Sequence, residues 1–95
     1  MSDQTLERNV MVTNPQGFHL RPASMFVKLA CTFQSKVEIL KGNDRFDGKS
    51  SLDLLTLGAG NGTTLTLRVS GVDASEAIEA LAALVESGFG ENNPG

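Results

Sequence analysis

The amino-acid sequence predicts an α+β fold, an open-faced β-sandwich in which a four-stranded antiparallel sheet carries three helices on one face. Segments with apolar residues at every second position alternate with segments of helical spacing, in the order βαββαβα. Each expected strand has one apolar and one polar face, so helices should cover one face of the sheet and water the other. The 95 residues suffice for one domain, which we take to span 1–95.

The first strand and the first helix are predicted from a change in the spacing of apolar residues. Around residues 10–13 the two valines alternate with other residues, as in a strand, and the turn-prone segment 14–17 ends that pattern. From about 20 to 32 the spacing is helical, and Pro22 suits the first turn, where its missing N–H costs nothing. The apolar face of this helix should contain Ala23, Phe26, Val27 and Ala30.

The remaining elements follow from the same two periods and from turn and capping residues. They are a strand at 37–39, a hairpin turn at 41–44, a return strand at 45–47, a short helix within 49–57 closed by Gly58, a strand at 64–69 and a helix that begins at Asp73 and stops at Gly88. Asp73 and Glu76 have the spacing of a capping box. The tail from about residue 90 to 95 should fray.

Composition argues against several classes of function. The net charge is −3 and the chain has neither Trp nor Tyr, which disfavours nucleic acid as a partner. No apolar run approaches the ~20 residues of a membrane-spanning helix, so we expect no membrane insertion and a cytoplasmic location. One His and one Cys are too few for a structural zinc site, and we expect no metal, no cofactor and a monomer.

The only histidine, His19, stands where the first helix should begin. The start of a helix has unpaired backbone N–H groups and partial positive charge, and both favour an anion. Arg21 adds a forked donor suited to phosphate oxygens, Gly17 permits tight backbone geometry, and Pro22 fixes the entry into the helix. A neutral imidazole is nucleophilic near neutral pH. The sequence therefore points to a phosphohistidine site.

Two motifs resemble those of one family. The first is Gly17-Phe18-His19-Leu20-Arg21-Pro22-Ala23, followed by Phe26-Val27-Lys28, and the second is Lys49-Ser50-Ser51-Leu52, which continues to Leu54-Leu55-Thr56-Leu57-Gly58. Together with the order of elements, they resemble HPr, the histidine-containing phosphocarrier of the phosphoenolpyruvate-dependent phosphotransferase system. The resemblance covers nearly the whole chain.

The resemblance implies a role for each matching residue. His19 would accept a phosphoryl group on Nδ1 from phosphorylated enzyme I and pass it to an enzyme IIA domain, as a carrier with a phosphohistidine intermediate rather than a free-standing enzyme. Arg21 would help to hold the phosphoryl group. Gly17, Leu20 and Pro22 would supply the backbone around it.

Two roles are expected for Ser50. It is expected to cap the short helix, with Asp53 at the capping-box position. The resemblance also implies that Ser50 is a regulatory serine, which an HPr kinase/phosphorylase would modify.

A surface for partners is expected beside His19. Helical spacing places Leu20, Ser24, Lys28 and Cys31 on one flank of the first helix, and the first three, with Leu52 and Leu55, are the expected docking surface. Leu55 could equally complete the core. We expect Cys31 to be an inert packing residue.

The leading hypothesis is therefore a phosphocarrier in a sugar phosphotransferase system. One alternative is a carrier of the nitrogen-related branch. Another is a purely regulatory HPr-like protein that acts by binding, and the presence of His19 counts against it.

Overall fold

The computed structural model describes residues 4–91 as one sheet with helices on one face. The sheet contains β1 (Gln4–Met11), β2 (Lys36–Lys41), β3 (Asp44–Asp47) and β4 (Thr64–Gly71), and the helices are α1 (Leu20–Ala30), α2 (Ser51–Leu55) and α3 (Ala74–Glu86). A 3₁₀ turn, η1 (Gly88–Gly90), follows α3. The predicted open-faced sandwich is confirmed, including the order βαββαβα.

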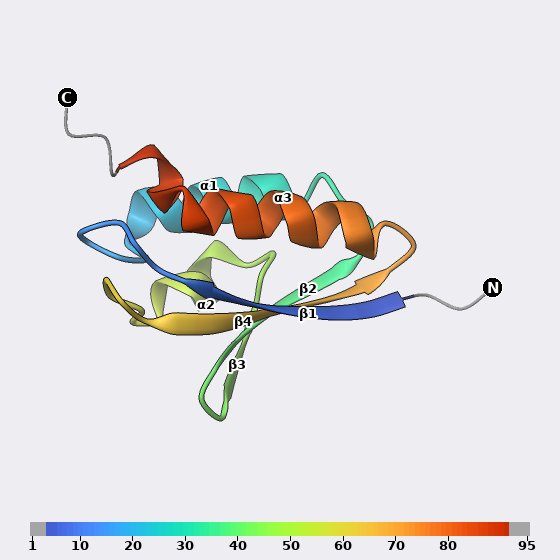
Figure 1. The fold of residues 1–95 in the computed structure, drawn as a ribbon, viewed down its shortest axis with the longest axis horizontal. Coiled ribbons are helices and arrows are strands. Elements are labelled where there is room, and N and C mark those ends of the chain that lie inside the picture. Colours follow the sequence, from blue (N-terminus) through green and yellow to red (C-terminus); the bar gives the residue numbers. More distant parts are fainter. Residues whose placement is uncertain (1–3, 92–95) are drawn as a thin grey trace.

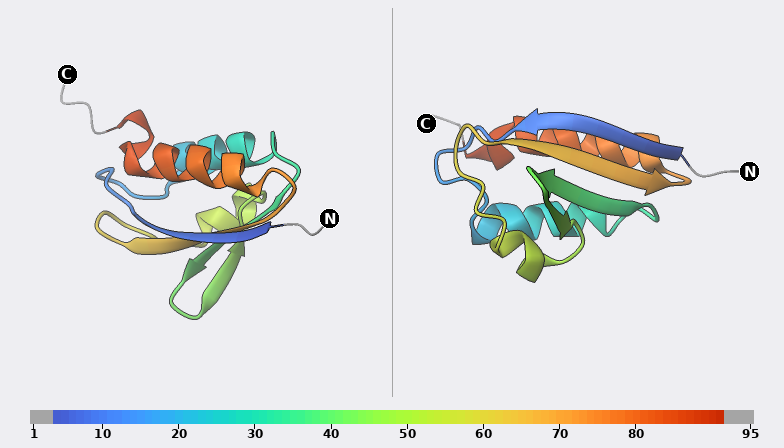
Figure 2. Two further views of the ribbon diagram at one scale, coloured as in Figure 1. Left: turned by 45° about the vertical axis from the view of Figure 1, so that its right-hand side comes forward. Right: turned by 90° about the horizontal axis from the view of Figure 1, so that it is seen from below.

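The strand order is β1-β4-β2-β3, and every neighbouring pair is antiparallel. The central strand β4 has the clearest period in the sequence, and Leu65, Leu67 and Val69 all point into the core. Helices α1 and α3 cross one face of the sheet, while α2 lies beside α1 and against β3 (Figures 1 and 2). Within residues 4–91, no helix lies over the opposite face (Figure 1).

That open face is held by polar pairs between strands. Arg68 of β4 donates to Glu7 of β1 at 2.7 Å, and Thr66 donates to Asn9 at the same distance. These residues are direct cross-strand partners, so each pair adds a contact without helping to cover the core. The alternation of period two thus separates an apolar face under the helices from a hydrated one.

The first strand is longer than predicted. It begins at Gln4 rather than near residue 10, because its first half pairs with the end of β4 although it is mostly polar. Arg8 reaches an ion pair with Glu79 of α3 at 3.1 Å, so an edge position that looks polar is still tied to the helix layer.

Two capping predictions have different outcomes. Ser50 caps α2 as expected, because its hydroxyl accepts from the backbone N–H of Asp53 at 3.2 Å. The predicted box of Asp73 and Glu76 is wrong, since the Asp73 side chain makes no bond to α3. Its backbone is not extended, as a side-chain cap requires, and its carboxylate accepts instead from the backbone N–H groups of Gln34 and Ser35, both at 2.9 Å.

The C-terminal segment also departs from expectation. Helix α3 stops as predicted before Gly88, which has a positive φ of 71°. Phe89, with φ of 55°, then turns back into the core and is fully buried. Glu91, expected to fray, makes hydrogen bonds with three side chains; the rest of the expected frayed tail, 92–95, lies outside the described residues.

The burial of Phe89 predicts a large loss of stability when its ring is removed. We expect Phe89→Ala to lower the free energy of unfolding by about 3 to 5 kcal/mol, as for other buried aromatic residues, measured by urea titration. Val72→Ala is the control, because Val72 is exposed and should cost less than about 0.5 kcal/mol. An unchanged unfolding midpoint in Phe89→Ala would contradict the packing described here.

Candidate phosphoryl-transfer site

The candidate site is built on the loop between β1 and α1. Asn14 is buried and donates to the backbone carbonyl of Gly17 at 2.7 Å, which closes the loop on itself. The backbone N–H of Phe18 donates to the carbonyl of Ala59 at 2.9 Å. Gly17 has φ of 67°, and a Cβ on it would lie 2.2 Å from the Ala59 carbonyl oxygen. Only glycine therefore fits this close approach.

His19 is the N-cap of α1. Its backbone carbonyl accepts from Ala23 at 3.0 Å, and its side chain does not cap the helix. The backbone N–H groups of Leu20 and Arg21 belong to the first turn, where a helix provides no acceptor, and Pro22 has no N–H. The ring thus stands at the positive end of the helix, and its side chain is 36% exposed.

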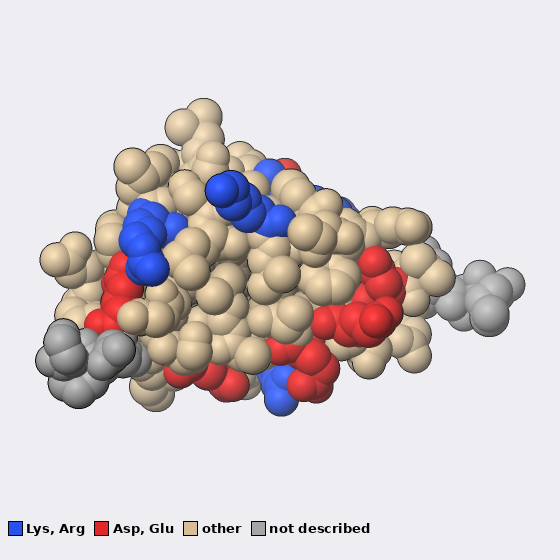
Figure 3. Space-filling model, turned by 90° about the horizontal axis from the view of Figure 1, so that it is seen from above, with Lys and Arg blue, Asp and Glu red and all other residues tan. Residues whose placement is uncertain are grey.

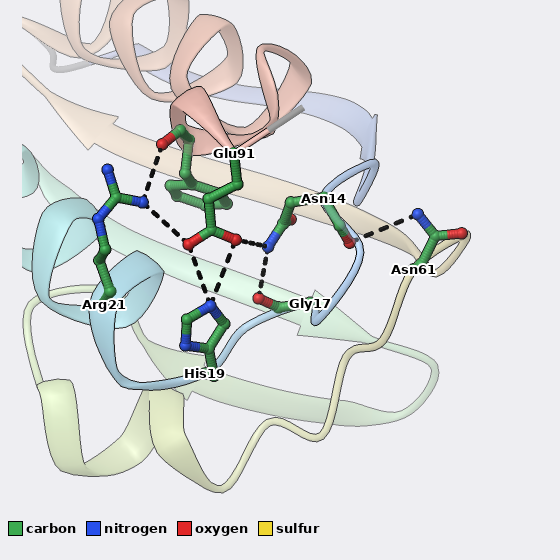
Figure 4. Close-up of polar contacts among 7 residues, drawn as sticks. Asn14, Gly17, His19, Arg21, Asn61 and Glu91 are labelled. Carbon is green, nitrogen blue, oxygen red and sulfur yellow. Dashed lines mark hydrogen bonds and ion pairs between the residues drawn. The ribbon is translucent and has the colours of Figure 1, made fainter. Parts of the chain in front are cut away.

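A carboxylate from the other end of the chain meets the ring. The Nε2 atom of His19 lies 3.0 Å from Oε2 and 3.3 Å from Oε1 of Glu91 (Figure 4). Arg21 donates to Oε2 of the same carboxylate at 2.9 Å, and Asn14 donates to Oε1 at 3.0 Å. Arg21 also donates to the Phe89 carbonyl at 3.2 Å. Two segments distant in sequence therefore meet at one imidazole.

The environment of Glu91 favours its ionised form. Burial opposes ionisation, but the hydrogen bonds from Asn14, His19 and Arg21 outweigh it and hold the pKa of Glu91 below its usual value. The sequence alone identifies neither Asn14 nor Glu91 as a site residue. Asn14 looked like a turn residue, and nothing in the pattern near Glu91 marks it as facing a residue 72 positions away.

The ring and the carboxylate border an open pocket. It has a volume of about 250 Å³ and is lined by Pro15, Gln16, His19 and Glu91. In Figure 4 the second ring nitrogen, Nδ1, points away from Glu91. No protein acceptor or donor contacts Nδ1 among residues 4–91, so this nitrogen is the one open to a reacting group. Within the same residues, no group of three or more His, Cys, Asp and Glu side chains is arranged to hold a metal.

The residues of the expected docking surface are exposed and lie on two neighbouring helices. Leu20 is 64% exposed, and on α2 Leu52 is 76% and Leu55 43% exposed, so Leu55 does not complete the core. Ser24 and Lys28 are exposed on α1, which contacts α2. Cys31 is exposed as well, so the expectation that it packs is wrong: it follows the last turn of α1, beyond the buried stripe.

Charge divides the helix layer along its length. Helix α1 contains Arg21 and Lys28 and no acidic residue, whereas α3 contains only acidic charges, Glu76, Glu79 and Glu86. Figure 3, which looks onto this layer, shows most of the visible basic side chains on the α1 side and most of the visible acidic side chains along the α3 edge. His19 and the α1 part of the docking surface therefore lie on the basic side of the layer.

The fold and the site together define a small α+β domain of the phosphocarrier type, with a half-exposed histidine at the start of its first helix. The family model described as the phosphorylation site of the HPr component of the phosphotransferase system matches residues 6–87. The chain belongs to the HPr family.

Individual relatives agree with this assignment. The chain is 37% identical to phosphocarrier protein HPr of Cupriavidus necator over 86 residues, covering 90% of this chain and 97% of that protein. It is 40% identical to phosphocarrier protein NPr of Shewanella violacea, covering 90% and 94%. Among solved structures, HPr-C-His from Thermoanaerobacter tengcongensis is similar with a TM-score of 0.88 and 38% identity, covering 93% of this chain and 99% of that one.

No helix within residues 4–91 has the length and apolar character needed to cross a membrane.

The lowered pKa of Glu91 predicts how its contact with Arg21 depends on pH. A carboxyl whose pKa falls on folding adds stability above its ordinary pKa, about 4.3, and that contribution is lost as the pH falls through the lowered value. We expect the ¹³C signal of the Glu91 carboxyl to titrate at a higher pH in Arg21→Ala than in the wild type. Arg45→Ala, which removes a partner of Glu38, is the control. Equal midpoints in all three proteins would contradict this account of the ion pair.

Proposed function

We propose that this protein accepts a phosphoryl group on His19 from phosphorylated enzyme I and passes it to an enzyme IIA domain of a sugar phosphotransferase system. The observation that supports this most is the placement of His19, with its ring half exposed at the first turn of α1 and its Nδ1 atom free of protein contacts within residues 4–91. The proposal rests also on membership of the HPr family, whose model spans this segment.

The first turn of α1 is suited to the phosphorylated state. A phosphoryl group on Nδ1 would carry negative charge next to the N–H groups of Leu20 and Arg21, where one charge typically gains about 0.3 to 1 kcal/mol. A gain of this size stabilises the product without trapping it, as a carrier requires. Gly17 and Pro22 shape the backbone on either side of the ring.

Arg21 is close enough to act on the same group. Its guanidinium and the His19 ring bind the same oxygen of Glu91, at 2.9 Å and 3.0 Å, so the two side chains are neighbours. A guanidinium offers several N–H donors, so Arg21 can turn toward phosphoryl oxygens by a change of rotamer.

The docking surface would bind both the donor and the acceptor. Its leucines supply an apolar centre beside His19, and Lys28 with Arg21 gives it a basic rim. A partner with an apolar patch bordered by acidic residues is complementary to it. This arrangement suits transient binding, because rim charges mainly speed encounter.

A carrier of the nitrogen-related branch is the second candidate. This candidate is supported by sequence identity, which is 40% with the NPr protein and 37% with an HPr protein. The two candidates share the phosphoryl chemistry at His19 and differ in the acceptor.

Regulation at Ser50 stays a prediction. The hydroxyl of Ser50 accepts from the N–H of Asp53, and the Asp53 carboxylate accepts from the N–H of Asp47 at 2.7 Å. A phosphate on Ser50 would add negative charge beside this carboxylate and next to Leu52 of the docking surface. Modification by an HPr kinase/phosphorylase would therefore weaken the binding of partners.

The proposed carrier role predicts an acid-labile, base-stable phosphate after incubation with enzyme I and phosphoenolpyruvate. We expect the label to be absent in His19→Ala, and its rate of formation in Arg21→Ala to fall about tenfold or more, since one charge-assisted hydrogen bond is worth about 1.5 to 3 kcal/mol. Arg45→Ala, on the hairpin β2–β3, should behave as the wild type. A wild-type protein that stays unlabelled with several enzymes I would refute the role.

The docking surface predicts that charge reversal at Lys28 weakens binding. We expect Lys28→Glu to raise the dissociation constant for enzyme I about three- to tenfold, as for a charge at the rim of an interface, measured by calorimetry. Lys36→Glu is the matched control: it changes the net charge equally but lies on β2, away from the docking surface. Equal weakening by both variants would mean that only the total charge matters.

A further inference from the structure

The Glu91 carboxylate is a feature of the site that lies outside the family match. The family model ends at residue 87, whereas Glu91 follows the turn η1 and reaches back to His19. Phe89, two residues earlier, is buried against Phe18 with ring centroids 5.2 Å apart. The segment that brings Glu91 to the ring is therefore anchored in the core of the protein.

The geometry at Glu91 determines which ring nitrogen carries the proton. An ionised carboxylate only accepts hydrogen bonds, so the 3.0 Å contact with Nε2 is a hydrogen bond when Nε2 carries the hydrogen. A neutral imidazole has one such hydrogen, so its lone pair is then on Nδ1. Asn14 and Arg21 donate to the same carboxylate and hold it in place, at 3.0 Å and 2.9 Å.

We propose that Glu91 is a positioning residue, which keeps the Nε2 proton of His19 in place and thereby directs phosphoryl transfer to Nδ1. This inference rests on the proposed function. Its logic is that of a carboxylate that orients a catalytic imidazole and stabilises the positive charge the ring acquires.

The phosphoryl transfer needs no movement of the Nε2 proton of His19. The Nδ1 lone pair forms the new N–P bond, while the bond between phosphorus and the donor breaks and its electron pair stays with the donor. The ring keeps its Nε2 hydrogen and becomes cationic, and the Glu91 carboxylate offsets that charge through the same hydrogen bond. When the phosphoryl group next leaves for an acceptor, the electron pair of the N–P bond returns to Nδ1 and the ring is neutral again.

The substitution Glu91→Gln separates this role from a merely structural one. The new side chain matches glutamate in shape but has an NH₂ group, which can donate to Nε2 and so favour the tautomer with hydrogen on Nδ1. Glu86→Gln is the matched control. It removes the same charge, but Glu86 is exposed on α3 and does not contact His19.

The first measurement needs no phosphoryl donor. The ¹⁵N signals of the two imidazole nitrogens of His19, recorded at about pH 8, report the tautomer. We expect hydrogen on Nε2 in the wild type and in Glu86→Gln, and a larger share of hydrogen on Nδ1 in Glu91→Gln. Backbone amide spectra check that the variants fold alike, and Glu91→Ala gives a second variant without a side-chain donor. Equal tautomer populations in the wild type and Glu91→Gln would overturn the proposal.

The second measurement is the rate of phosphorylation by enzyme I. We expect Glu91→Gln to slow it about three- to tenfold, the size of one partly exposed charge interaction, and Glu86→Gln to leave it unchanged. Faster phosphorylation of Glu91→Gln would overturn the proposal, because Glu91 would then be a competitor of the phosphoryl group. If the wild-type protein accepts no phosphate, the proposed function is refuted. The tautomer experiment then still tests the role of Glu91, because it needs no phosphoryl donor.

Discussion

The packing of three phenylalanine rings holds the candidate site together. Phe18 precedes His19, and its ring centroid lies 6.0 Å from that of Phe26 in α1 and 5.2 Å from that of Phe89 beyond α3. Both contacts are edge-to-face, the arrangement that aromatic rings prefer. Phe18 is buried one residue before His19, and Phe89 is buried two residues before Glu91, so this cluster aligns His19 with Glu91.

The cluster separates an apolar interior from a polar surface within one or two residues of chain. Phe18 is buried while His19 is half exposed, and Phe89 is buried while Glu91 keeps 19% of its side-chain surface in contact with solvent. The polar groups are thereby near water but fixed in direction. This is the combination that a reversible carrier needs, since the acceptor nitrogen must be reached by large partners and must also keep its orientation between encounters.

The site residues expected from the sequence lie within 17–22, whereas the docking surface also includes residues of α2. Helix α2 lies beside α1, so the exposed leucines of α2 extend the exposed flank of α1. Helix α3 lies on the other side of the layer with acidic charges only. A partner with negative charge is therefore favoured on one side of the helix layer and disfavoured on the other.

The sequence by itself determined the order of elements, the faces of β4 and α1, the cap at Ser50 and the place of His19 at a helix start. These depend on spacing and on neighbours a few residues away, which local physical rules describe. It did not reveal the first half of β1, because that edge segment is polar and is a strand only through its pairing with β4. It also assigned Asp73 to its own helix, whereas the carboxylate bonds a loop nearly forty residues earlier in the chain.

Only the tertiary structure decided that Glu91 faces His19. The sequence predicts that the tail frays, because no apolar periodicity continues to Glu91 and two glycines, Gly88 and Gly90, lie just before it. Phe89 adopts a left-handed backbone conformation, unfavourable for an aromatic residue by local rules, and its burial compensates for that conformation. The contacts of His19 and Arg21 with Glu91 exist only once the fold has brought α1 and α3 side by side. No local sequence pattern encodes them.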